Sequence, residues 1–107
     1  MNNTNTLARL QDWYLAMTNG DWEHTYGIDI GNIDNPGWTF KVELVDTPLY
    51  EVAFEKFVVQ REAKDNWLHC EVKDGNFKGA GGPLNLEELM VVSVSYTHLT
   101  LPTIYSV

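Results

Sequence analysis

Residues 28–44, IDIGNIDNPGWTFKVEL, decide the fold. From Trp38 to Leu44, apolar and polar residues alternate without interruption, which is typical of a β-strand with one buried face. Ile28-Asp29-Ile30 alternates in the same way. Asp34-Asn35-Pro36-Gly37 lies between them and is a strong turn signal, because proline presets φ and glycine accepts positive φ. The stretch therefore predicts an antiparallel hairpin.

The segment Val52–Arg61 is the next predicted strand. Its apolar residues change parity part-way, since Val52 and Phe54 share one parity while Phe57 and Val59 share the other. A bulge near Glu55-Lys56 would reconcile the two halves. A helix is the alternative, which the β-branched pair Val58-Val59 disfavours.

Two further strands follow a turn at Asp65-Asn66. Leu68, Cys70 and Val72 alternate with polar residues and predict the fourth strand. Asp74-Gly75 is a hairpin turn signal that leads into a fifth strand at Asn76-Phe77-Lys78. The glycine-rich stretch 79–83 is then expected to form an irregular loop.

One helix is predicted at each end of this β-rich region. Helical spacing over residues 6–18 places Leu7, Leu10, Tyr14 and Met17 on one face, with Trp13 beside them. Asn85-Leu86-Glu87-Glu88 has the form of a capping box, so a second helix of about eight residues should begin at Asn85. The predicted class is α+β: an N-terminal amphipathic helix packed on an antiparallel β-meander of about five strands, followed by a short, truncated C-terminal helix.

The last residues differ in composition from the rest of the chain. All 15 acidic and 7 basic residues lie at or before Glu88. Residues 94–103, VSYTHLTLPT, resemble one reading frame of a common transposase sequencing adapter, and that frame also accounts for the final Val107. We therefore expect residues 1–93 to form a single domain and residues 94–107 to be a non-native tail. Such a tail should have few buried contacts or form an implausible extension of the Asn85 helix.

Charge narrows the class of partner. The formal net charge is −8, and a surface of this sign repels nucleic-acid phosphates and anionic lipids but attracts basic proteins. The N-terminus has no apolar signal region, and no apolar run is as long as a membrane span. A single cysteine, Cys70, fits a reducing compartment. These features predict a cytoplasmic protein with no nucleic-acid or membrane partner.

The densest polar cluster is Asp21-Trp22-Glu23-His24. Its carboxylates and imidazole could bind a metal or perform acid–base chemistry. No paired metal motif such as HExxH accompanies it. The sequence favours a structured loop in which Trp22 packs while Glu23 and His24 form hydrogen bonds. Cys70 falls on the apolar parity of its strand and is interpreted as a small core residue.

The chain resembles the immunity protein 53 family of bacterial polymorphic toxin loci. The segments that carry the resemblance run from about Leu7 to Leu89 and are Leu10–Tyr14 (LQDWY), Gly20–Gly27 (GDWEHTYG), Ile33–Trp38 (IDNPGW), Phe54, Asp65–Cys70 (DNWLHC) and Phe77–Leu86 (FKGAGGPLNL). The resemblance implies a non-enzymatic protein, without a cofactor, that neutralises a cognate toxin in the cytosol by direct binding. The chain departs from the family pattern at the adapter-like tail, where the last helix should continue with aromatic and apolar residues.

An acidic inhibitor suits a basic partner, such as a nuclease-type toxin domain, because opposite charges speed association. The predicted partner contacts are Asp21, Trp22, Glu23, His24, Asp29, Asp34 and Glu43, with Trp22 as an anchor. Two alternatives stay open: a small metal-binding or enzymatic module that uses Asp21, Glu23 and His24, and a general protein-interaction domain. The sequence leaves the oligomeric state open.

Overall fold

The predicted hairpin is present as strands β1 (Ile28–Ile33) and β2 (Gly37–Glu43). The computed structural model describes residues 5–34, 36–60 and 65–98. In β2 the side chains of Phe40 and Val42 are buried, and Trp38 on the same parity is half-buried. The indole Nε1–H of Trp38 donates a hydrogen bond of 2.9 Å to the carbonyl oxygen of Pro83. The alternation read from the sequence therefore corresponds to one buried and one open face.

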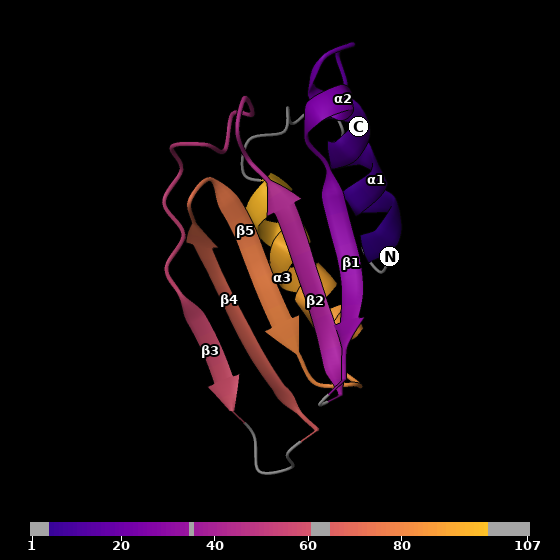
Figure 1. The fold of residues 1–107 in the computed structure, drawn as a ribbon, viewed down its shortest axis with the longest axis vertical. Helices are drawn as coiled ribbons and strands as arrows, with labels where there is room; N and C mark the ends of the chain where they lie inside the picture. The colour runs from indigo at the N-terminus through magenta and orange to yellow at the C-terminus, as the bar shows by residue number, and fades with distance from the viewer. Residues whose placement is uncertain (1–4, 35, 61–64, 99–107) are drawn as a thin grey trace.

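The described residues form a five-stranded sheet in the order β1-β2-β5-β4-β3, with every neighbouring pair antiparallel (Figure 1). The remaining strands are β3 (Phe57–Gln60), β4 (Trp67–Lys73) and β5 (Asn76–Gly81). The α+β class is confirmed. The order departs from a consecutive meander at one place, because β2 pairs with β5 and the chain leaves β2 for the far edge of the sheet.

Strand β3 is shorter than expected. The pairing with β4 begins at Phe57, and residues 52–56 lie outside the ladder, so no bulge near Glu55-Lys56 is needed. The irregular segment lets Phe54 reach the core, where its ring lies 5.4 Å from that of Phe77. The change of parity in the sequence thus marks the position where β3 begins.

Strand β5 is longer than expected. It continues through Gly79 and Gly81, which the sequence placed in a loop. A Cβ atom at Gly79 would lie 2.9 Å from Cδ2 of Leu89. The glycine is therefore a point of close approach between the sheet and the C-terminal helix, in line with the use of glycine where a second element packs against a strand.

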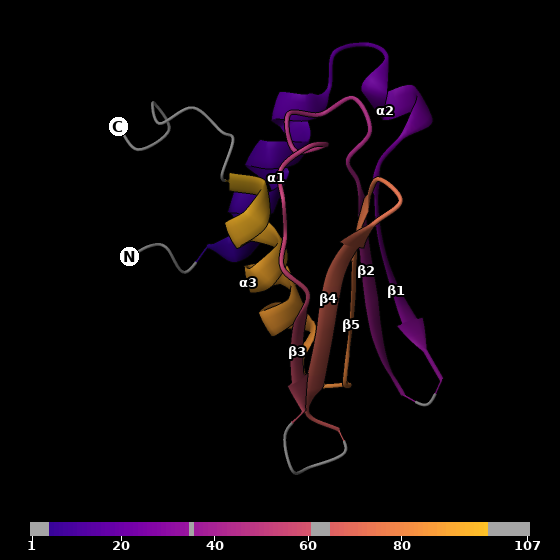
Figure 2. The same ribbon diagram turned by 90° about the vertical axis from the view of Figure 1, so that its left-hand side faces the viewer.

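Helices α1 (Thr6–Met17) and α3 (Leu86–Thr97) cover the same face of the sheet, and the other face stays open (Figure 2). In α1 the buried side chains are Leu10 and Trp13, whereas Leu7 and Tyr14 are exposed. The predicted apolar face was therefore wrong at these two positions. Trp13 turns into the core, where its ring packs edge-to-face against that of Trp22, with centroids 5.9 Å apart.

Helix α3 begins after Asn85, as predicted, but it has 12 residues and ends at Thr97. The helix exceeds the expected length of about eight residues because residues 94–97 extend it, which is one of the two outcomes expected for the tail. Val94, Tyr96 and Thr97 are buried, so the first residues of the predicted tail form the last turn of a packed helix. The non-native origin of residues 94–107 stays a prediction, and residues 99–107 lie outside the described part of the chain.

Asn85 precedes α3 without capping it through its own side chain. Its Oδ1 accepts a hydrogen bond from the backbone N–H of Trp67, and its Nδ2 donates to the carboxylate of Glu88 and to Oδ1 of Asn66. The predicted capping box is therefore replaced by a buried link between the start of α3 and the start of β4. This link holds the helix against the sheet.

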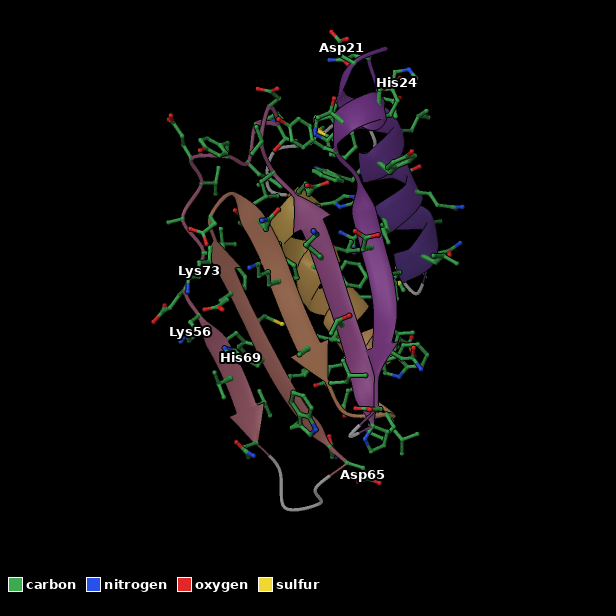
Figure 3. All side chains as sticks on the ribbon, in the orientation of Figure 1. Asp21, His24, Lys56, Asp65, His69 and Lys73 are labelled. Carbon is green, nitrogen blue, oxygen red and sulfur yellow. The ribbon has the colours of Figure 1, made fainter. Side chains whose placement is uncertain are left out.

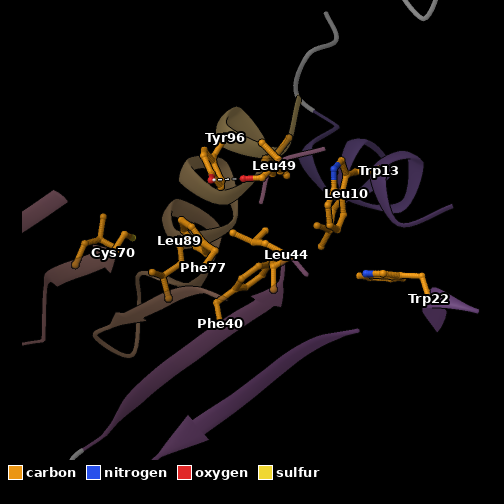
Figure 4. Packing of buried hydrophobic residues seen from close by; sticks show 13 residues of the cluster. Leu10, Trp13, Trp22, Phe40, Leu44, Leu49, Cys70, Phe77, Leu89 and Tyr96 are labelled. Atoms are coloured by element: carbon orange, nitrogen blue, oxygen red, sulfur yellow. Dashed lines mark hydrogen bonds between the residues drawn. The ribbon is translucent and has the colours of Figure 1, made fainter. Parts of the chain in front are cut away.

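The core lies between the sheet and the two long helices (Figure 4). Phe40 and Phe77 come from the sheet, Leu44 directly follows β2, and Leu89 and Tyr96 come from α3. The rings of Phe77 and Tyr96 are stacked with centroids 6.0 Å apart. Because the apolar residues of the strands pack against the helices, the alternate, polar residues lie on the opposite face of the sheet. The candidate surface is on that face.

Candidate interaction surface

The open face of the sheet carries a row of four charged residues. Cross-strand pairing places Asp29 of β1 opposite Lys41 of β2, Lys41 opposite Lys78 of β5, and Lys78 opposite Glu71 of β4. Lys41, Lys78 and Glu71 have the parity opposite to the buried residues of their strands, and Asp29 is exposed on β1. Read across the sheet, the signs of the charges are therefore negative, positive, positive and negative.

A second row, of smaller residues, lies beside the charged one. Thr39 is opposite Ala80, and Ala80 is opposite His69. The two rows line a hollow of about 420 Å³ on the open face. Figure 3 shows this face toward the viewer, with His69 on β4. The hollow exists because short side chains at Thr39 and Ala80 adjoin long ones at Lys41 and Lys78.

Basic residues gather on this face although the chain as a whole is acidic. The described residues contain five basic side chains, and all except Arg9 lie on or beside the open face. Lys56 forms an ion pair of 3.8 Å with Glu71, and Lys73 lies on the open parity of β4 (Figure 3). Neither Lys41 nor Lys78 forms an ion pair with a described residue. Like charges directly opposite each other in an antiparallel pair are unfavourable.

His69 adds an unused polar atom to the hollow. Its Nε2 is buried and has no hydrogen-bond partner among the described residues. Buried polar atoms are nearly always paired, so an unpaired one needs an explanation. A group that enters the hollow could supply the missing partner.

The Asp21–His24 cluster lies away from this surface, at helix α2 (Trp22–Thr25) beyond one end of the sheet (Figure 3). Both oxygens of Glu23 accept backbone hydrogen bonds, at 2.9 Å from Asn19 and 2.8 Å from Gly20. Hydrogen bonds from the backbone, first its own N–H and then that of Asn19, lower the pKa of Glu23. The side chain therefore holds the loop, as the loop interpretation predicts for Glu23.

Trp22 is buried, with 2% of its surface exposed. Its Nε1–H donates a hydrogen bond of 3.1 Å to the carbonyl oxygen of Val45. The ring is a core residue that closes one end of the molecule, so it does not stand on a contact surface. Asp21 and His24 on either side of it remain exposed.

The other predicted contact residues are dispersed. Asp34 is exposed at the β1–β2 turn. Glu43 is half-buried and accepts a 2.9 Å hydrogen bond from the backbone N–H of Gly27. Asp29 alone lines the hollow. Sequence reasoning did not identify Lys41, His69 and Lys78 as site residues. Alternation shows which face of the sheet a residue occupies, but not which residue lies opposite it on the neighbouring strand.

The described residues offer little for metal or nucleophile chemistry. No group of three or more His, Cys, Asp or Glu side chains within them could hold a metal ion. Burial, together with the charge of Glu88, raises the pKa of the Cys70 thiol to about 11. The thiol is therefore protonated at neutral pH, as expected for a core cysteine. In the described ranges, no helix has the length and apolar character of a bilayer span.

Comparison with known families identifies the family of this chain. The sequence model of immunity protein 53 matches residues 7–96. The chain belongs to the immunity protein 53 family. No curated protein and no solved structure matched it. In this immunity protein 53 chain, the family match includes all four residues of the charged row. It also extends three residues past Ser93, to Tyr96 in the last turn of α3.

Proposed function

We propose that this protein is a non-enzymatic immunity protein that binds a cognate bacterial toxin in the cytosol and neutralises it. The observation that carries the proposal is the match to immunity protein 53 over residues 7–96. That range contains every strand and nearly all of both long helices. The match therefore covers almost all of the described fold, which supports carrying the family's role over to this chain.

Overall charge supports a basic partner. A net charge of −8 attracts a positively charged protein over distances of about 8–10 Å at ordinary ionic strength. Many proteins that cut nucleic acid have basic clefts, so a nuclease-type toxin domain is the partner class that we propose. Asp21, His24, Asp29 and Asp34 are exposed and stay in the proposed contact set. Trp22 and the half-buried Glu23 and Glu43 act within the fold.

The competing reading, a metal-binding or enzymatic module at Asp21, Glu23 and His24, has less support. Metal ligands need free lone pairs that converge on one point. Both oxygens of Glu23 already accept hydrogen bonds from the backbone of the preceding loop. Metal analysis of the purified protein, compared with the His24→Ala variant, separates the two readings. Stoichiometric metal that is lost in the variant would favour the module.

The direct test uses the protein domain encoded immediately upstream of this gene, where we expect the cognate toxin. Cells that express this domain should stop growing, and co-expression of the immunity protein should restore growth. Titration calorimetry with a catalytically inactivated toxin domain should show saturable binding. Growth arrest that persists at full immunity-protein expression, without binding in the calorimeter, would refute the proposal.

A further inference from the structure

The centre of the open sheet face is positive on a protein whose net charge is −8. We propose that the hollow beside Lys41 and Lys78 is the toxin-docking surface and that it receives an acidic side chain of the toxin. This inference rests on the proposed function and specifies the surface and the chemistry of the contact.

The lysine pair is the first reason. Lys41 and Lys78 are directly opposite in the β2–β5 ladder, where Cβ atoms are about 4.5–5.5 Å apart. Their ammonium groups repel each other, and neither forms an ion pair with a described residue. A carboxylate placed between them would relieve the repulsion and form two charge-assisted hydrogen bonds. The free protein thus presents a site for one negative group.

The flanking carboxylates are the second reason. Asp29 and Glu71 stand at the two ends of the row, so the positive centre has a negative residue on each side. A complementary surface has an acidic residue in the middle and basic residues around it. Such a pattern is compatible with a toxin that is basic overall. It also gives selectivity, because a uniformly basic surface would place a positive charge against the lysine pair.

The shape of the surface is the third reason. The hollow of about 420 Å³ lies in the volume range of binding pockets, roughly 300–1,000 Å³. Its floor belongs to three paired central strands, which hold the lysines in place before binding and so reduce the entropic cost of association. His69, whose Nε2 has no hydrogen-bond partner among the described residues, lines the same space.

The experiment measures binding of the same inactivated upstream toxin domain by calorimetry at two salt concentrations. Lys78→Glu reverses an exposed charge of the pair. Arg9→Glu makes the identical charge change on an exposed position of α1, in the helix layer, and is the matched control. We expect Lys78→Glu to weaken binding at least about tenfold. Arg9→Glu should change it less than about twofold. The difference between the variants should shrink at high salt.

The outcomes separate the docking surface from the function. If the wild-type chain binds and Lys78→Glu binds equally well, the docking surface is wrong and the proposed function stands. If Lys78→Glu strengthens binding, the sign of the contacting group is wrong. If the wild-type chain does not bind, the proposed function itself fails.

A second measurement does not depend on any variant. Amide chemical shifts of the wild-type chain are followed as the toxin domain is added. Changes centred on Thr39, Lys41, Lys78 and Ala80 support the docking surface. Changes confined to α1 and α3 overturn it. This readout remains decisive if Lys78→Glu fails to fold.

Discussion

The hydroxyl group of Tyr96 donates a hydrogen bond of 2.9 Å to the carbonyl oxygen of Val52, 44 residues earlier in the chain. The bond joins the last turn of α3 to the irregular segment before β3. Tyr96→Phe removes it and leaves the buried ring in place. We expect the free energy of unfolding to fall by about 1 kcal/mol. Urea denaturation measures the change, and Tyr14→Phe on the exposed side of α1 is the control. Equal stabilities for the two variants would contradict the prediction.

The origin of residues 94–107 is a prediction about the gene. Reading the parent gene from independent DNA should give other residues after Ser93. Because positions 94 and 96 face the core, the native residues there should be apolar or aromatic. A natural run of codons through VSYTHLTLPT would refute the adapter interpretation. Charged native residues at positions 94 and 96 would contradict the buried placement of this turn.

Acid should weaken the loop before α2 through Glu23. Its pKa in the folded protein is lowered from the ordinary value of 4.5, chiefly by backbone hydrogen bonds. A lowered pKa means that the ionised group stabilises the fold above the unfolded-state pKa. That contribution is lost as the pH falls through the lower, folded-state value. The stability difference between the wild-type chain and Glu23→Gln should therefore be constant near neutrality, begin to decline near pH 4.5 and vanish once the pH is below the folded-state pKa.

Thermal melting of the wild-type chain and of Glu23→Gln, from about pH 2 to about pH 7, measures this stability difference on both sides of the carboxyl pKa. The same substitution at exposed Glu51 is the control. Superimposable pH profiles for the two variants would argue against a special role for Glu23.

Gly82 should tolerate no side chain. A Cβ atom there would collide with the backbone oxygen of Asp65 and lie 2.9 Å from Oδ1 of Asn85. Backbone cannot move aside cheaply, so Gly82→Ala should cost about 1–3 kcal/mol of stability. Gly27→Ala is the matched control, since no atom lies within 4 Å of its added Cβ. Calorimetric melting of both variants checks the prediction, which fails if their midpoints fall equally.

Cys70 should react with thiol reagents only when the protein unfolds. The side chain is fully buried, and its pKa is raised to about 11. At pH 8 the thiol is both covered and protonated, and protonated thiols are poor nucleophiles. Absorbance after addition of an aromatic disulfide reagent should stay flat in buffer and reach one equivalent in urea. Rapid labelling of the folded chain would show that β4 opens locally.

Local patterns were sufficient for several elements. Asp74 and Gly75 both have positive φ values, 57° and 78°, as a tight hairpin turn with this sequence requires. The alternation at Trp38–Leu44 and at Leu68–Val72 placed the buried residues of β2 and β4 correctly. These features depend on neighbouring residues alone, so the sequence contains all the information needed to predict them.

Other features depend on residues that are distant in the chain. Glycine at positions 79 and 81 is read locally as a loop, yet both residues join β5 because β2 and β4 pair with them on either side. Tyr14 was assigned to the buried face of α1, but it stays exposed at the edge of Trp22, and Trp13 takes the fully buried place against that ring. Neither outcome can be predicted from the spacing of residues within one segment. Each depends on which other strand or helix packs against that segment.

From its sequence alone this protein was predictable as an α+β immunity protein, with its hairpins and the starts of its helices, because alternation, turn residues and family motifs are local properties. The tertiary structure decided three further points. It buried Trp22, extended α3 to Thr97 and aligned Asp29, Lys41, Lys78 and Glu71 in one row. The row requires the pairing of β2 with β5, which joins strands separated by more than 30 residues. Cross-strand register results from packing the whole sheet against its helices, and no local pattern encodes it.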